Sequence, residues 1–257
     1  MATSTVTLSA LSDIPLVEPG DDLGAILIGA IEGGGYCLHD RDVLVIAQKI
    51  VSKAENRYVD LADVAPSPRA VELASAVKKD PRLVEVILSE STEVVRHRGE
   101  VLIVAHRLGF VMANAGVDQS NIEHPGGRDR VLLLPKDPDG SCSVMKNRLD
   151  AHFGVEIGVV INDSFGRAWR NGVVGVALGA AGLPAIVDMV GEPDLFGRRM
   201  RVTQIALADE VASAASLLMG QAAEGRPAVL VRGLDWGARR AIAARELVRP
   251  KELDLFR

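Results

Sequence analysis

Blocks of hydrophobic and polar positions predict a chain of short helices and strands. Apolar residues recur at helical spacing from Leu23 to Ile31, behind the acidic pair Asp21-Asp22, and glycines 33–35 end this helix. The stretch 42–47 is a mainly β-branched apolar run bounded by charges, which is typical of a buried strand. The beginning of the chain therefore predicts a helix that leads into a core strand.

Similar patterns continue downstream, and glycine or proline marks most of the boundaries. The expected elements are two helices at 67–79 and 81–89, a hairpin with strands 100–105 and 110–113, a strand at 131–134, a helix capped by Ser141 and ending near Gly154, a strand at 157–161, a strand at 202–205, a helix at 206–219, a strand at 227–231 and an amphipathic helix at 236–247. Residues 162–164 are expected to follow their strand into a loop rich in arginine and glycine.

The order of these elements favours a single mixed unit over residues 1–257. There is no internal repeat, charge block or linker, and the interleaved hairpins break any regular alternation of strand and helix. Residues 235–257 are expected to form a C-terminal helix and tail.

Composition and charge exclude several classes of protein. With 48% hydrophobic and 25% charged residues, the chain has the balance of an ordinary globular protein. Its net charge of −5 offers no general attraction to nucleic acid or to an anionic membrane, so we expect neither as a partner. The longest uncharged stretch, 172–187, is too short to span a bilayer. Two cysteines and the absence of basic residues before Arg41 predict a cytoplasmic protein without a signal peptide.

The standard catalytic motifs are missing. The sequence contains no phosphate loop, dinucleotide-binding glycine pattern, serine nucleophile elbow or HExxH zinc motif, and its five histidines show no metal-ligand spacing. Any chemistry must therefore come from a less familiar set of residues.

Two aspartates are the most informative candidates. Asp118 and Asp163 each come just beyond an apolar strand, and Ser164 adds a hydroxyl beside the second. Oxygen ligands of this kind suit Mg²⁺ or Mn²⁺, which typically bind one or two carboxylates together with substrate phosphates. On spacing alone, aspartates that cap turns by bonding nearby amides are an equally good interpretation.

Basic residues could supply the anion-binding half of such a site. Guanidinium groups match phosphate or carboxylate oxygens, although solvated surface arginines are more common than functional ones. The candidates are Lys53, Arg167, Arg170, Arg198, Arg199 and Arg226.

At these residues the sequence resembles the coenzyme F420:L-glutamate ligase family, also called the F420-0:gamma-glutamyl ligase family. The similarity covers roughly residues 13–234 and rests on several independent motifs in order. These are Ile14-Pro15-Leu16-Val17 with Gly20-Asp21-Asp22-Leu23, Ser52-Lys53-Ala54-Glu55, Asn114-Ala115-Gly116-Val117-Asp118 with Ser120-Asn121, Leu134-Pro135 with Asp137-Pro138-Asp139-Gly140, Asp163-Ser164-Phe165-Gly166-Arg167 with Trp169-Arg170, Ala208-Asp209-Glu210 and Val231-Arg232-Gly233.

The resemblance implies a GTP-dependent ligase that adds L-glutamate to a deazaflavin precursor, F420-0, through an acyl phosphate and then extends a γ-linked oligoglutamate tail. It implies a divalent metal, Mg²⁺ or Mn²⁺, and makes K⁺ a further candidate ion. The metal-ligand positions are Asp118, Asp163, Ser164 and Gln221. Asp118, Asp163, Arg167 and Arg170 are the expected catalytic residues. The nucleotide-binding positions are Asp13, Ile14, Pro15, Leu16, Gln48, Lys49, Lys53, Asn121, Met219, Gly220, Gln221, Ala222, Ala223, Glu224, Gly225 and Arg226.

The resemblance also implies an unusual α+β fold with mixed sheets, much antiparallel pairing, flanking helices and an intertwined homodimer. Three departures from the family pattern are visible. Asp13 stands where glycine is frequent, which weakens the expectation that this segment contacts guanine; Asn56 replaces another frequent glycine, and Ser164 replaces threonine but keeps the hydroxyl.

Two other functions are compatible with the same residues. One is a different metal-dependent phosphoryl-transfer enzyme, such as a small-molecule kinase or phosphohydrolase. The other is a non-catalytic nucleotide-binding module. If the protein is a ligase, its product gains the mass of one glutamate. If it is a binding module, it shows no turnover, so substitutions at the two aspartates cannot abolish any.

Overall fold

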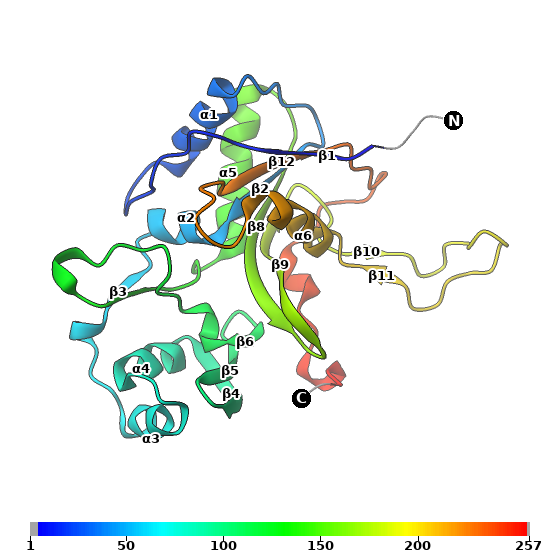
Figure 1. The fold of residues 1–257 in the computed structure, drawn as a ribbon. Coiled ribbons are helices and arrows are strands. Elements are labelled where there is room, and N and C mark those ends of the chain that lie inside the picture. The colour runs from blue at the N-terminus through cyan, green and yellow to red at the C-terminus, as the bar shows by residue number, and fades with distance from the viewer. Residues whose placement is uncertain (1–4, 256–257) are drawn as a thin grey trace.

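The computed structural model describes residues 5–255 and is built around a five-stranded sheet (Figure 1). The strands lie in the order β1-β12-β2-β8-β9, and the parallel pair β2–β8 is flanked by antiparallel neighbours. Their bounds are β1 Thr7–Ala10, β2 Val43–Ala47, β8 Gly158–Arg167, β9 Arg170–Ala181 and β12 Ala228–Arg232.

Helices cover both faces of this sheet. Side chains alternate along a strand, so Leu44 and Ile46 of β2 face a core that includes α1 (Leu23–Gly33) and α5 (Pro138–Phe153). Val43 and Val45 face the opposite core against α6 (Leu207–Met219). Because both faces of β2 are buried, its sequence is continuously apolar rather than alternating.

A second group of elements packs beside the sheet around its own core. Helices α3 (Pro68–Val77) and α4 (Pro81–Ser89) lie against the antiparallel sheet β4-β5-β6, and Figure 1 shows this group below the main sheet. Those strands are β4 Ser91–Arg98, β5 Val101–His106 and β6 Val111–Ala113. A short pair, β3 (Tyr58–Asp60) with β7 (Arg130–Leu132), connects this group to the helix α2 (Gln48–Ala54).

A long ribbon projects away from the rest of the molecule. It begins and ends at the pair β10 (Val187–Asp188) and β11 (Gln204–Ile205). Leu195 and Phe196 in the ribbon are 98% and 95% exposed. Large apolar side chains so far from the core indicate a surface suited to contact with another chain.

These elements confirm the expected α+β class and most of the predicted segments, with two corrections near the site. The expected strand at 157–161 is longer, because β8 continues to Arg167 and carries residues 162–164 within it rather than in a loop. Helix α5 begins earlier than predicted, because Asp137 rather than Ser141 caps it and Pro138 occupies its first position.

The expected helix at 236–247 was wrong. Only Ala244–Leu247 form a 3-10 turn, with a second at Lys251–Leu253, and residues 256–257 of the predicted tail lie outside the described part of the chain. Ile242 instead exchanges backbone hydrogen bonds with Leu183 and Ala185, and the buried carboxylate of Asp139 accepts from the Ala244 N–H. These long-range bonds replace the local bonds that a helix would have made.

None of the helices between residues 5 and 255 is both long and apolar enough to cross a bilayer.

Candidate functional site

The candidate site lies where the parallel strands β2 and β8 reach the same edge of the sheet. Ala47, the last residue of β2, is paired with Asn162 of β8, and α2 starts directly afterwards. This places Lys49, in the first turn of α2, beside Asp163. Between Ile161 and Asn162 the β8–β9 register shifts, since β9 carries one extra residue there. Such a bulge bends the strands and redirects side chains at a sheet edge.

Asp118 is brought to the same place from the second group of elements. Asn114, Ala115 and Gly116 all have positive φ and turn the chain sharply after β6. Asp118 then exchanges two backbone hydrogen bonds with Leu132 in β7. Its Oδ2 atom lies 2.5 Å from the Nζ atom of Lys49. Two aspartates that lie 45 positions apart in the sequence thus share one lysine neighbour.

The two carboxylates have opposite pKa shifts. Burial raises the pKa of Asp118, but the hydrogen bond and charge of Lys49, helped by Ser120, outweigh it and hold that pKa below its ordinary value. Burial raises the pKa of Asp163 to about 6. The hydrogen bond from the Ser164 backbone N–H and the charge of Lys49 oppose this rise, and the negative charge of Asp118 adds to it. A half-buried pair of carboxylates of this kind is stabilised by added positive charge.

A cavity of about 420 Å³ opens beside these residues. Of the predicted nucleotide-binding and metal-binding positions, the following line it: Ile14, Pro15, Leu16, Gln48, Lys49, Lys53, Asn121, Asp163, Ser164, Met219, Gly220, Gln221, Ala222, Ala223, Glu224, Gly225 and Arg226. This volume falls within the range of small-molecule sites. Segments from five separate parts of the sequence therefore form one concave surface.

The loop after α6 is held in a specific shape. Gly220 ends α6 with φ 73° and ψ −171°, a conformation that is essentially restricted to glycine. The Glu224 carboxylate accepts a 2.8 Å hydrogen bond from the Ala222 N–H, and the Asn121 amide donates to the Ala222 carbonyl at 3.1 Å. The loop is thereby tied to the segment that carries Asp118.

Some predicted residues lie elsewhere. Asp13 does not line the cavity. Asp118 does not line it either, but it contacts Lys49, which does. Arg167 and Arg170 lie exposed at the turn between β8 and β9, where Arg167 donates to the Gly172 carbonyl. Arg198 and Arg199 lie in the projecting ribbon. Within one described chain these arginines are not brought to the cavity.

Asn162 was missed by the sequence reasoning. It is buried next to Asp163, its amide donates to Ser216 at 3.3 Å, and its Oδ1 atom has no hydrogen-bond partner within the described residues. It also lines the cavity. Its position between the apolar run 157–161 and Asp163 was the only available signal.

The donor atoms fit a divalent metal. Within residues 5–255 no three His, Cys, Asp or Glu side chains cluster for metal binding. The Asp163 carboxylate, the Ser164 hydroxyl and the Gln221 amide nevertheless provide hard oxygen donors at the cavity, and Asp118 adds a carboxylate beside Lys49. Nucleotide phosphates complete such a set in many magnesium sites. The raised pKa of Asp163 indicates a place where a cation would be favoured.

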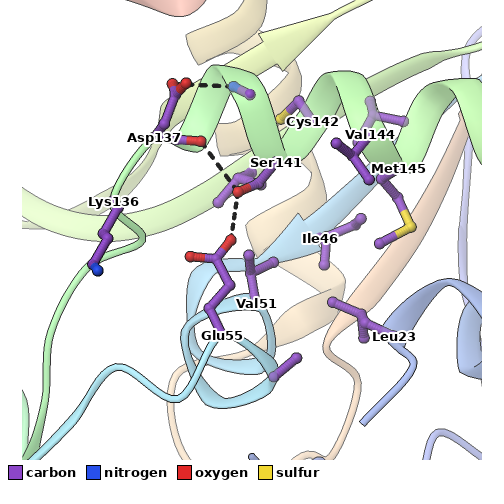
Figure 2. Close-up of a pocket in the computed structure, with 14 residues that line it drawn as sticks. Leu23, Ile46, Val51, Glu55, Lys136, Asp137, Ser141, Cys142, Val144 and Met145 are labelled. Carbon is purple, nitrogen blue, oxygen red and sulfur yellow. Dashed lines mark hydrogen bonds between the residues drawn. The ribbon is translucent and has the colours of Figure 1, made fainter. Parts of the chain in front are cut away.

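A second cavity of about 430 Å³ lies across α2 from the first. Figure 2 shows its apolar wall of Ile46, Val51 and Met145, with polar side chains gathered at one end. There Ser141 donates to Glu55, and Asp137 accepts from the Gly140 N–H. Its carboxylates thus already accept bonds from within the chain, and it lacks the convergence of basic groups found on the other side of α2.

The chain was compared with known proteins, and a family model described as F420-0:Gamma-glutamyl ligase matches residues 12–233. Three relatives named Coenzyme F420:L-glutamate ligase resemble it over nearly their full lengths. The Methanothermobacter thermautotrophicus protein is 46% identical, covering 98% of this chain and 99% of the relative. The Methanopyrus kandleri protein is 46% identical, covering 96% and 97%. The Methanocaldococcus jannaschii protein is 43% identical, covering 95% and 94%.

Proposed function

This chain belongs to the F420-0:gamma-glutamyl ligase family, and from that membership we propose that it is a coenzyme F420:L-glutamate ligase. The proposed substrates are then F420-0, which the family description names, and L-glutamate, which the names of the relatives include. Similarity that extends over almost the whole chain supports a shared activity more strongly than similarity of one segment would.

The cavity beside α2 is the proposed site for GTP. Lys49, Lys53 and Arg226 place positive charge along its wall, and the loop 220–226 presents backbone groups to the nucleotide. The observation that carries this assignment is the meeting of Asp118, Lys49 and Asp163 at its edge. Asp118, Asp163, Ser164 and Gln221 would hold a divalent metal, which when bound neutralises charge on the phosphate oxygens.

The proposed reaction has two steps. An oxygen of the precursor carboxylate attacks the γ-phosphorus of GTP, so that an acyl phosphate forms and GDP leaves. The amine of L-glutamate then attacks the acyl carbon and loses a proton to solvent, so that the amide bond forms and phosphate leaves with the electron pair of the broken C–O bond. Lys49 and Lys53 orient and stabilise the phosphates in this scheme, and no protein nucleophile is needed.

The direct test combines the purified protein with F420-0, L-glutamate, Mg²⁺ or Mn²⁺, and either GTP or ATP, with and without K⁺. Mass spectrometry of the deazaflavin product is expected to show the addition of glutamate, with nucleoside diphosphate released only when both acceptor and glutamate are present. Nucleotide hydrolysis without ligation would instead favour a phosphohydrolase, and failure with both nucleotides would contradict the proposal.

The proposed assembly is a homodimer in which the projecting ribbon contacts the partner. The exposed Leu195 and Phe196 support this, because burial on a second subunit would remove their apolar surface from water. The exposed Arg167 and Arg170 then become candidates for the site of a neighbouring subunit.

A further inference from the structure

A third cavity, of about 430 Å³, adjoins the proposed nucleotide cavity on the side of the β3–β7 pair. The two share Leu16, Val17, Lys53 and Asn121 as wall residues. None of the functions discussed above uses the rest of this cavity. A ligand in it would lie next to a nucleotide in the first cavity.

The walls carry four charged side chains of mixed sign. Lys53 and Arg130 are basic, and Glu18 and Glu123 are acidic. None of the four forms an ion pair with another residue in the range 5–255. Elsewhere in the molecule, charged side chains such as Lys49 and Arg57 are paired with carboxylates at 2.5–3.5 Å. The guanidinium of Arg130 lies 4.0 Å above the Tyr58 ring, which fixes its position at the wall.

The charges of these wall residues act on one another. Burial lowers the pKa of Lys53, and the charge of Glu123 opposes that shift. Burial raises the pKa of Tyr58; Arg130 opposes this rise, and Glu123 and Glu18 add to it. The charge of Glu123 therefore acts both on Lys53, which lines the two cavities, and on Tyr58, whose ring Arg130 contacts.

We propose that this cavity binds the amino-acid substrate, an α-amino acid with a second carboxylate in its side chain. Such a molecule carries two negative groups and one positive group, which matches two cations and a pair of carboxylates. Arg130 and Lys53 receive its carboxylates, and Glu123 with Glu18 receives its ammonium group. The inference rests on the proposed ligase function and names where its second substrate lies.

The test is steady-state kinetics of ligation with Arg130→Gln, with Arg130→Lys as the conservative variant and Arg128→Gln as the matched control. Arg128 is two residues away in the same segment, does not line the cavity, and its side chain is 69% exposed. Loss of one charged hydrogen bond is expected to raise the KM for L-glutamate by about tenfold or more. The KM for GTP should change less than about twofold, Arg130→Lys should recover part of the loss, and Arg128→Gln should resemble the parent protein.

Calorimetric titration of L-glutamate into the protein with a non-hydrolysable GTP analogue reads the same subsite without turnover. Binding that weakens in both Arg130→Gln and Glu123→Gln supports the inference even if no ligation occurs, a result that would count against the proposed function alone. If the parent protein ligates but Arg130→Gln leaves the glutamate KM and affinity unchanged, the subsite is wrong. A raised KM for GTP with an unchanged KM for glutamate would assign the cavity to the purine base and overturn the inference.

Discussion

The carboxyl groups of Asp118 and Asp163 have different pKa values because their immediate neighbours differ. Lys49 contacts Asp118 directly and keeps it ionised, whereas Asp163 is buried with less compensation and its pKa rises to about 6. Pairs of carboxylates with opposed environments are typical of functional sites. The local chemistry is therefore more distinctive than the residue types, which were ambiguous in the sequence.

A structural cluster provides a separate test at the residue scale. Glu90 bonds the guanidiniums of Arg57 and Arg107 at 3.1 Å. The His106 Nδ1 atom accepts from the Leu108 N–H, so its proton lies on Nε2, 3.5 Å from Glu90. His106 lowers the pKa of Glu90 most, burial opposes it, and Arg107 and Arg57 help bring that pKa to about 2.

We predict that Glu90→Gln lowers the free energy of unfolding by about 3 kcal/mol at pH 7. Because the folded protein lowers the pKa of Glu90 from 4.5, its stabilisation is complete above about pH 4.5 and is lost as the pH falls toward 2. Urea unfolding of the two proteins at several pH values between 7 and 3 measures this difference. A difference that stays constant across that range would contradict the assigned role of Glu90.

At the scale of elements, the loop after α6 depends on one backbone conformation. A Cβ atom at Gly220 would lie 2.1 Å from the Glu224 side chain, in addition to the strain of its φ and ψ angles. We predict that Gly220→Ala destabilises the protein by roughly 1–3 kcal/mol and weakens GTP binding, as measured by thermal unfolding and calorimetry. Gly225→Ala is the matched control, since it also has positive φ but no atom lies within 4 Å of its added Cβ. Equal effects of the two changes would show that the contact with Glu224 is unimportant.

The helices and strands were predictable from sequence only where their apolar pattern dominates. Helix α6 and strand β2 followed from periodicity because their own packing determines them. Helix α2 has seven residues and no side-chain cap, so local signals were weak, although it carries Lys49 and Lys53. The segment 236–247 does not form the predicted helix, because it makes long-range hydrogen bonds with Asp139 and with residues 183–185. No local sequence pattern reveals these bonds.

The site shows the same division. The motifs of the family resemblance identified most of the residues that line the cavity, but neither periodicity nor spacing could bring Asp118 to Lys49. That contact depends on the left-handed turn at 114–116 and on the bridge to Leu132. Asn162 escaped notice because β8 continues as a strand where a loop was expected.

At the scale of the whole molecule, the proposed dimer makes a direct prediction. The double change Leu195→Ser with Phe196→Ser is expected to convert a dimer into monomers, because it removes the most exposed apolar side chains of the ribbon. Analytical ultracentrifugation of both proteins measures the change. Leu217→Ser, on exposed α6 surface outside the ribbon, serves as the control. A monomeric parent protein, or a double variant that dimerises as tightly as the parent, would contradict the assembly.

The central claim is that Asp118 and Asp163 together hold the cation that makes a nucleotide usable for ligation. Turnover of F420-0 with L-glutamate and GTP, followed by mass spectrometry, tests it in Asp118→Asn, Asp163→Asn and the exposed control Asp235→Asn. We predict that each of the first two changes lowers the rate by at least about a hundredfold while circular dichroism shows an intact fold, and that the control keeps its activity. Ligation at near-parent rates in either Asp118→Asn or Asp163→Asn would contradict the account.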